Sequence, residues 1–294
     1  MAIRGNVVGL DYVQAWRVGN DGHMYGTLGQ SAAALAAVAA QVTMPPILLR
    51  NARSAQIPAP ARVVRQLTGG NRLLGQISFA PIDLGSFALT LSDLDMQLNA
   101  IATESAVDQT TNSRWTFSGT NDNKDQLPAM GLMLTARYQS REAGSDGVNK
   151  FVHYLMPRVE IAPTLPQMSF QAEADVTYNV VPSYGERAPF GLLLSDMAMS
   201  LTENRALVFI AVTDNPLLLG SSIMDGTATT ITLPYKPLFD TAANDDTPNL
   251  ITLNGVKVAP ASVVPATGVI TLSGAGSDDD HVAWAVETAF EAVA

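Results

Sequence analysis

Polar and apolar residues alternate without a break along one stretch of the chain, MSFQAEADVTYNV, from Met168 to Val180. Side chains of a strand point alternately to its two faces, so this pattern predicts a strand with one buried face and one wet face. It would be roughly twice the usual strand length of about 5–6 residues, which indicates an extended ribbon. The wet face has acids and no base, and its members are Ser169, Gln171, Glu173, Asp175, Thr177 and Asn179.

Similar patterns predict β structure along most of the chain. Strands are expected over 6–18, over three segments within 62–91, and over a long hairpin that runs out along 131–139 and returns along 150–161. After residue 215, short apolar segments separated by turn residues predict a small antiparallel sandwich or barrel, with Asn254–Gly255 as its strongest turn signal. The acidic run SDDDH, 277–281, is expected to be a solvated turn between two of these segments rather than a cation site.

Two segments have helical spacing. Ser31 is suited to cap an alanine-rich helix over 32–42, and Ser92 to cap a helix over 93–104 whose first turn holds two aspartates. Between these helices, residues 43–61 are punctuated by prolines and are expected to be irregular, as an extended arm or a loop.

Charge is spread unevenly along the chain. The 294 residues have a net charge of −10, made up of +2 over 1–100, −4 over 101–205 and −8 over 206–294. The short β segments also begin near 215, so we place a boundary near 213–222, between a β domain over 1–214 with an inserted arm at 31–61 and an acidic β domain over 215–294. Charged residues make up only 15% of the chain, against about 25% in a typical protein, which favours a surface largely covered by assembly.

The sequence lacks the residue constellations of an enzyme. It has no cysteine, and its three histidines, His23, His153 and His281, lie in distant segments. No nucleotide-binding loop, nucleophile elbow or zinc motif is present, so we predict no catalytic, cofactor-binding or metal-binding residues and no cofactor. The tryptophans at 16, 115 and 284 lie in three separate segments and form no basic, aromatic cluster, which favours a core or interface role over stacking on nucleic acid.

The charge and hydropathy of the chain also limit its partners. An acidic chain has no basic footprint for gripping nucleic acid. No apolar run approaches the roughly 18–20 residues of a membrane helix, and the N-terminus has no signal-like apolar core, so we expect a protein folded in a cytoplasm, with no membrane segment.

The order of four segments resembles the major tail tube proteins of tailed bacteriophages, over residues 1–205. They are GLDYVQAWRV (9–18), LTGGNRLLGQISFAPIDLGSFALTLSDLD (67–95), the long hairpin, and FQAEADVTYNVVPS (170–183). The resemblance implies a mainly β fold, a sandwich or barrel with a flanking helix and a long hairpin, which assembles into stacked hexameric rings around a channel for DNA. The six polar residues of the ribbon would then face that channel.

The same resemblance implies the partners and the location. Copies of the chain would contact one another, and tail proteins such as the tape measure and the terminator would bind the tube, while DNA passes without specific binding. The protein would belong to the virion tail and would be assembled in the host cytoplasm. The arm at 31–61 would grip a neighbouring subunit, and the domain over 215–294, immunoglobulin-like or another small β fold, would decorate the outside. The alternatives are a capsid or decoration protein and a carbohydrate-binding tail fibre module.

Overall fold

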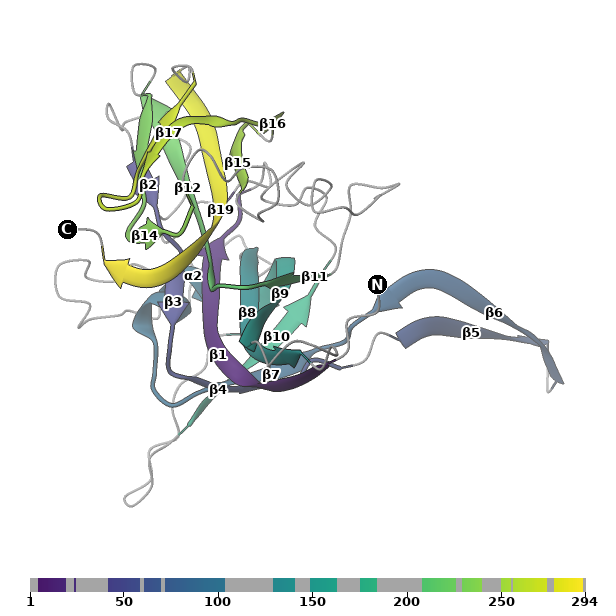
Figure 1. Cartoon of the computed structure of the whole chain (residues 1–294). Coiled ribbons are helices and arrows are strands. Elements are labelled where there is room, and N and C mark those ends of the chain that lie inside the picture. Colours follow the sequence, from purple (N-terminus) through teal and green to yellow (C-terminus); the bar gives the residue numbers. More distant parts are fainter. Residues whose placement is uncertain are drawn as a thin grey trace.

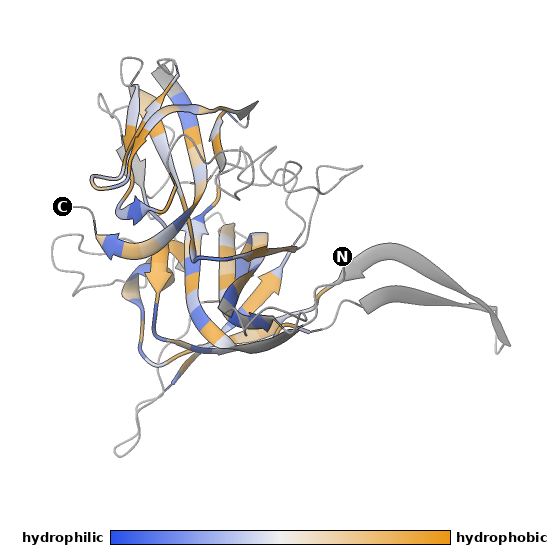
Figure 2. Cartoon of the chain, in the orientation of Figure 1, coloured by the Kyte–Doolittle hydropathy of each residue, from blue (hydrophilic) through white to orange (hydrophobic). Residues whose placement is uncertain are grey.

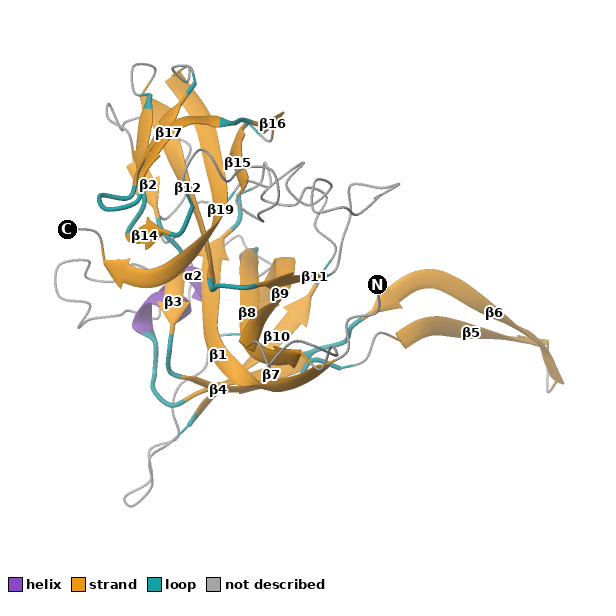
Figure 3. Cartoon of the chain, viewed as in Figure 1, coloured by secondary structure: helices purple, strands orange, loops and turns teal. Residues whose placement is uncertain are grey.

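The mainly β fold predicted from the sequence is confirmed. The computed structural model describes residues 5–19, 24, 42–58, 61–69, 72–103, 129–140, 149–162, 175–183, 208–225, 229–239, 250–254, 256–273 and 278–292. Within these ranges the chain forms antiparallel sheets and one helix, α2 (Figures 1 and 3). The alanine-rich helix predicted over 32–42 lies almost wholly outside the described residues.

The larger sheet, sheet A, curls until its two outer strands approach each other. Its path runs β3–β1–β8–β9–β10–β7–β4, and β11 pairs with β9. The two outer strands follow each other in the chain with only Arg50 and Asn51 between them, and β4 also contacts β1. The described strands nevertheless leave the sheet open rather than closed into a barrel. The bounds are β1 (Gly5–Arg17), β3 (Ile47–Leu49), β4 (Ala52–Ala55), β7 (Phe87–Leu91), β8 (Met130–Ser140), β9 (Asn149–Ile161), β10 (Val176–Pro182) and β11 (Phe209–Thr213).

Helix α2 (Met96–Thr103) covers part of the concave side of sheet A. Its residues Leu98 and Ile101 join the buried cluster formed by the inner faces of β1, β7, β8, β9 and β10, where apolar residues recur along the strands (Figure 2). The N-cap is Asp95, whose carboxylate accepts the backbone N–H of Leu98 at 2.7 Å, and not Ser92 as the sequence predicted. Ser92 instead donates its backbone N–H to the carbonyl of Asn51 at 2.9 Å, so the chain is still tied to β4 at that point.

The second sheet, sheet C, is centred on the long strand β19 (Asp278–Ala292). Its path is β16–β15–β19–β12–β2, and β14 also pairs with β19. A separate three-stranded sheet, β13–β18–β17, packs against it around a shared apolar cluster. The bounds are β2 (Val42–Met44), β12 (Leu217–Asp225), β13 (Thr230–Thr232), β14 (Tyr235–Pro237), β15 (Leu250–Leu253), β16 (Val256–Lys257), β17 (Pro260–Val264) and β18 (Val269–Leu272).

Two predictions for this half of the chain have different outcomes. Asn254, in the turn between β15 and β16, has a φ of +49°, which agrees with the turn predicted there. The acidic run was wrongly predicted to be a turn, because Asp278–Asp280 already belong to β19, with Asp278 opposite Asp225.

The proline-punctuated segment is not irregular, contrary to the sequence prediction. Within it lie β2, which pairs with β12 of sheet C, and β3 and β4, which form the two edges of sheet A. Each of these short strands is specified by a partner far away in the sequence, so local punctuation could not identify them.

The sequence predicted strands within 62–91, and two of them, β5 (Ala61–Gly69) and β6 (Arg72–Asp83), form a two-stranded ribbon separate from the other sheets. The ribbon is inserted between β4 and β7, which are themselves paired neighbours in sheet A. Strands β4 to β7 thus make one long hairpin: the pair β4 and β7 belongs to sheet A, and the pair β5 and β6 leaves it (Figure 1). From here on we call residues 61–83 the arm. This segment follows the one at 31–61 for which the sequence predicted an arm and is distinct from it.

Each sheet contains a tryptophan that lies flat over a glycine of the next strand. Trp16 of β1 is opposite Gly131 of β8, and Trp284 of β19 is opposite Gly220 of β12. A Cβ added to Gly131 would lie 2.1 Å from the Trp16 ring, and one added to Gly220 would lie 2.3 Å from the Trp284 ring. Both tryptophans are fully buried, which confirms a core role for these two; Trp115 lies outside the described residues.

Two side chains of β1 join sheet A to the backbone of β12. The Tyr12 hydroxyl donates to the carbonyl of Leu217 at 3.0 Å and accepts its N–H at 2.9 Å. Gln14 donates to the same carbonyl at 2.6 Å and accepts the N–H of Leu219 at 3.0 Å. Farther along, β2 pairs with residues 221–223 of β12. Side chains and a strand from the first half of the chain thus occupy this edge of β12 together.

We expect Gln14→Leu to lower the free energy of unfolding by about 2–4 kcal/mol, because it leaves the Leu219 N–H without its acceptor and the Leu217 carbonyl without one donor in a buried site. Urea unfolding would measure the change. The control is Gln139→Leu at an exposed position of β8, where we expect a change within about 0.5 kcal/mol. Equal effects of the two substitutions would contradict a joining role for Gln14.

Candidate functional site

Strand β10 has the buried and wet faces that the alternating sequence predicted. From Val176 to Pro182 its residues are alternately buried and exposed, with Val176, Tyr178 and Val180 in the core of sheet A. Asp175, Thr177 and Asn179 are exposed on the opposite face. The other three members of the predicted set, Ser169, Gln171 and Glu173, lie outside the described residues.

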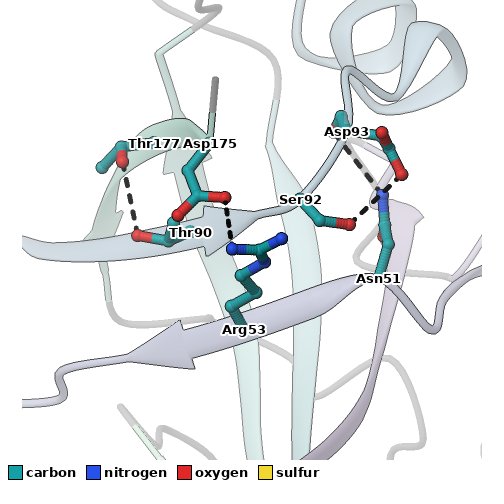
Figure 4. Close-up of polar contacts among 7 residues, drawn as sticks. All are labelled: Asn51, Arg53, Thr90, Ser92, Asp93, Asp175 and Thr177. Atoms are coloured by element: carbon teal, nitrogen blue, oxygen red, sulfur yellow. Dashed lines mark hydrogen bonds and ion pairs between the residues drawn. The ribbon is translucent and has the colours of Figure 1, made fainter. Parts of the chain in front are cut away.

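The exposed face of β10 continues onto its neighbours β7 and β4 (Figure 4). Thr177 lies opposite Thr90 of β7, and their hydroxyl oxygens are 3.3 Å apart. Asp175 forms an ion pair with Arg53 of β4, with Nη1 and Oδ1 separated by 3.1 Å. We call Arg53, Thr90, Asp175, Thr177 and Asn179 the polar strip.

A β-bulge brings Arg53 into the strip. Ala52 pairs with Leu91 and Ser54 with Thr90, so Arg53 is the extra residue between the two pairs. The side chains of Arg53 and Ser54 are both exposed, which breaks the alternation of β4. The bulge places a guanidinium beside the carboxylate of a strand 122 positions later, with both side chains about half exposed (50% and 40%).

Arg53 corrects one expectation for this face, which the sequence of the ribbon alone described as free of bases. The base comes from a different strand, and it neutralises the one carboxylate of the strip. The five described residues of the strip are therefore polar with no net charge. Its groups donate and accept hydrogen bonds, but they include no histidine, cysteine or pair of carboxylates for acid–base or nucleophilic chemistry.

Polar contacts at one end of the strip fix the path of the chain towards α2. The Asn51 side chain donates to the carbonyl of Asp93 at 3.5 Å, and the Ser92 hydroxyl donates to the Asp93 carboxylate at 3.2 Å (Figure 4). Together with the backbone bond between Ser92 and Asn51, they tie the ends of β4 and β7 together.

A cavity of about 640 Å³ lies beside the strip, at the open side of sheet A. Its walls come mainly from apolar residues of β1, β4, β8 and β9 and from the segments that lead into the arm. The polar exceptions are Arg53, Ser54 and Tyr154, and the described lining residues include no carboxylate, histidine or cysteine. The cavity is suited to apolar contact and offers no catalytic group among these residues.

The two described histidines are buried and belong to different sheets. His153 of β9 lies between two hydroxyls, with Thr135 Oγ1 2.8 Å from Nδ1 and Thr213 Oγ1 2.8 Å from Nε2. The Thr213 hydroxyl donates to the carbonyl of Asn215, so it accepts from His153, which therefore has its proton on Nε2. His281 donates through Nε2 to the Met24 carbonyl at 2.9 Å in the contact between the two sheets. His23 lies outside the described residues.

The described residues contain no group of three or more histidines, cysteines, aspartates or glutamates that could hold a metal ion. None of the helices in the described ranges is long and apolar enough to cross a membrane. Comparison with protein-family models and with curated protein sequences finds no match.

The sequence signal that could have found Arg53 is weak, since nothing near it predicts a bulge or a partner at Asp175.

We expect acid to destabilise the protein through His153. Burial lowers its pKa to about 3 from an ordinary value near 6.5, so between these two values the unfolded chain takes up a proton that the folded chain refuses. The contribution of His153 to the free energy of unfolding then falls by about 1.4 kcal/mol for each pH unit below about 6.

The measurement is urea unfolding of the wild type and of His153→Gln at several values between pH 7 and pH 4.5. All other groups are common to both proteins, so the difference between the two pH dependences belongs to His153. We expect the free energy of unfolding of the variant to depend on pH less steeply than that of the wild type, by about 1.4 kcal/mol per pH unit. Identical slopes would mean that His153 is not kept neutral by the fold.

Proposed function

We propose that this chain is a structural virion protein, the repeating subunit of a bacteriophage tail tube. In this proposal copies form stacked rings, hexameric as the resemblance above implies, and DNA passes through them. The observation that carries the proposal is the polar strip, whose five residues lie on one side of a well-packed sheet and together have no net charge.

A passage for DNA must not hold DNA. Each base that pairs with a phosphate releases counterions and adds a contact that has to be broken as the duplex moves. In the strip the one guanidinium is already paired with a carboxylate, and the remaining groups are hydroxyls and an amide. Such a surface gives a duplex weak, exchangeable contacts and no fixed counter-charge, which is the property a conduit needs.

The open form of sheet A also suits assembly. Its two outer strands, β3 and β4, each have one side without a partner strand among the described residues. Unpaired strand edges readily pair with other chains unless the protein covers them. Lateral pairing of the curled sheets of neighbouring copies would cover these edges and place equivalent faces around one axis.

Negative-stain electron microscopy of the purified full-length protein tests the proposal. We expect annuli, singly or stacked, with stain in the centre. Flat arrays of hexamers and pentamers would favour a capsid protein, and trimers a decoration protein or fibre. A dispersed monomer at high concentration would rule out the tube.

Lysines introduced into the strip test whether it faces DNA. We expect Thr177→Lys/Asn179→Lys to raise the affinity of assembled rings for a short DNA duplex at least about tenfold at low salt, because lysines of all copies converge on one passage. The gain should disappear in high salt. Fluorescence anisotropy of a labelled duplex measures the affinity.

The control variant is Thr232→Lys/Ser262→Lys, which adds the same charge at exposed positions of β13 and β17. These positions lie in the small sheet over the second half of the chain and outside the strip. An equal rise in affinity for both variants would mean that net charge alone matters and that the strip has no special position.

A further inference from the structure

Among the described residues, the two strands of the arm pair only with each other. β5 and β6 pair with each other from Ala61 opposite Asp83 to Gly69 opposite Arg72, and the described strands of sheets A and C pair with neither. An isolated two-stranded hairpin is at best marginally stable in water, since it cannot bury a face. We therefore expect a ribbon of this length to pack one of its faces against another surface.

The arm and the rest of the chain have opposite charges. Three arginines, Arg62, Arg65 and Arg72, and one aspartate, Asp83, give the arm a net charge of +2, so the remaining residues carry −12. The contrast extends upstream, because residues 22–82 contain five arginines and no acid at all. The arm is thus complementary in charge to the body of any copy of this chain.

We propose that the arm binds the acidic surface of a second copy of this chain. The arm leaves sheet A in a direction away from the body of its own chain (Figure 1). A second copy would bring a body with a net charge of −12 to the arm during assembly. The contact is head-to-tail, with the arm of one copy on the body of the next, and such contacts produce rings or filaments. This inference rests on the self-assembly proposed above and names the element that drives it.

Nucleic acid is a weaker candidate for the same surface. Three arginines offer few phosphate contacts, and the body that carries the arm has a charge of −12, which repels a polyanion. The same negative charge attracts the arm of a neighbouring copy. Charge therefore favours a second copy over DNA.

An armless variant tests the inference. Ala61 and Asp83 are cross-strand partners, so Arg62–Ile82 can be replaced by an Asn-Gly turn without moving β4 or β7. We expect this variant to unfold at the temperature of the wild type and to need at least about ten times the protein concentration to assemble. Sedimentation velocity measures assembly, and thermal unfolding confirms that the body folds.

A charge-reversal variant tests the electrostatic part without removing the arm. Arg62→Glu/Arg65→Glu/Arg72→Glu should weaken assembly as strongly as the deletion, whereas the matched control Arg62→Lys/Arg65→Lys/Arg72→Lys should assemble like the wild type. Wild-type assembly should also weaken between about 50 mM and 500 mM salt, because exposed charges are screened over that range.

The outcomes separate this inference from the proposed function. If the wild type forms annuli and the armless variant forms them equally well, the inference is overturned and the tube proposal stands. If the wild type self-associates through the arm without forming annuli, the inference stands and the tube proposal falls. If the arm changes only the affinity for a DNA duplex, the partner is nucleic acid and the inference is overturned. A wild type that stays monomeric at low salt overturns both.

Discussion

The arrangement of the molecule depends on one edge of β12. Buried backbone N–H and C=O groups must find partners, and this edge faces sheet A rather than water. Tyr12 and Gln14 bind the backbone at Leu217 and Leu219, and β2 pairs with the residues that follow. Burial raises the pKa of Tyr12, so its hydroxyl keeps the proton it donates. The need to satisfy a single strand edge thus sets how the two halves of the chain meet.

Continuous packing around that edge follows from it. One buried cluster contains Tyr12, Trp16 and Met133 from sheet A together with Leu217, Leu219 and Ala283 from sheet C. The hydroxyl of Ser221 and the ring of His281 both donate to the Met24 carbonyl in the same contact. The acidic second half is therefore attached to the first through a buried, hydrogen-bonded interface.

The sequence pattern predicted those elements that are determined by residues adjacent in the chain. Alternation placed β8, β9 and the two faces of β10, and Asn254–Gly255 placed a turn, because period and turn chemistry are written in adjacent residues. It failed for β2, β3 and β4, each defined by a distant partner, and for the cap at Asp95, since a bond to Asn51 holds Ser92 outside the helix. For the polar strip it identified the residues of β10 but missed Arg53, whose position depends on a bulge.

The missed arginine and the arm belong to one stretch of chain, and this has a physical consequence. Residues 22–82 hold five arginines and no acid, so any carboxylate that pairs with one of them comes from another part of the chain or from another copy. Arg53 is balanced within the subunit by Asp175, and Arg50 lies over the ring of Phe290 at 5.4 Å. Both contacts lie outside the arm. The three arginines of the arm lie beyond the point where the hairpin leaves sheet A, so the acids of the body are more readily supplied to them by another copy. A single basic segment would then neutralise the strip inside each subunit and attract the next subunit outside it.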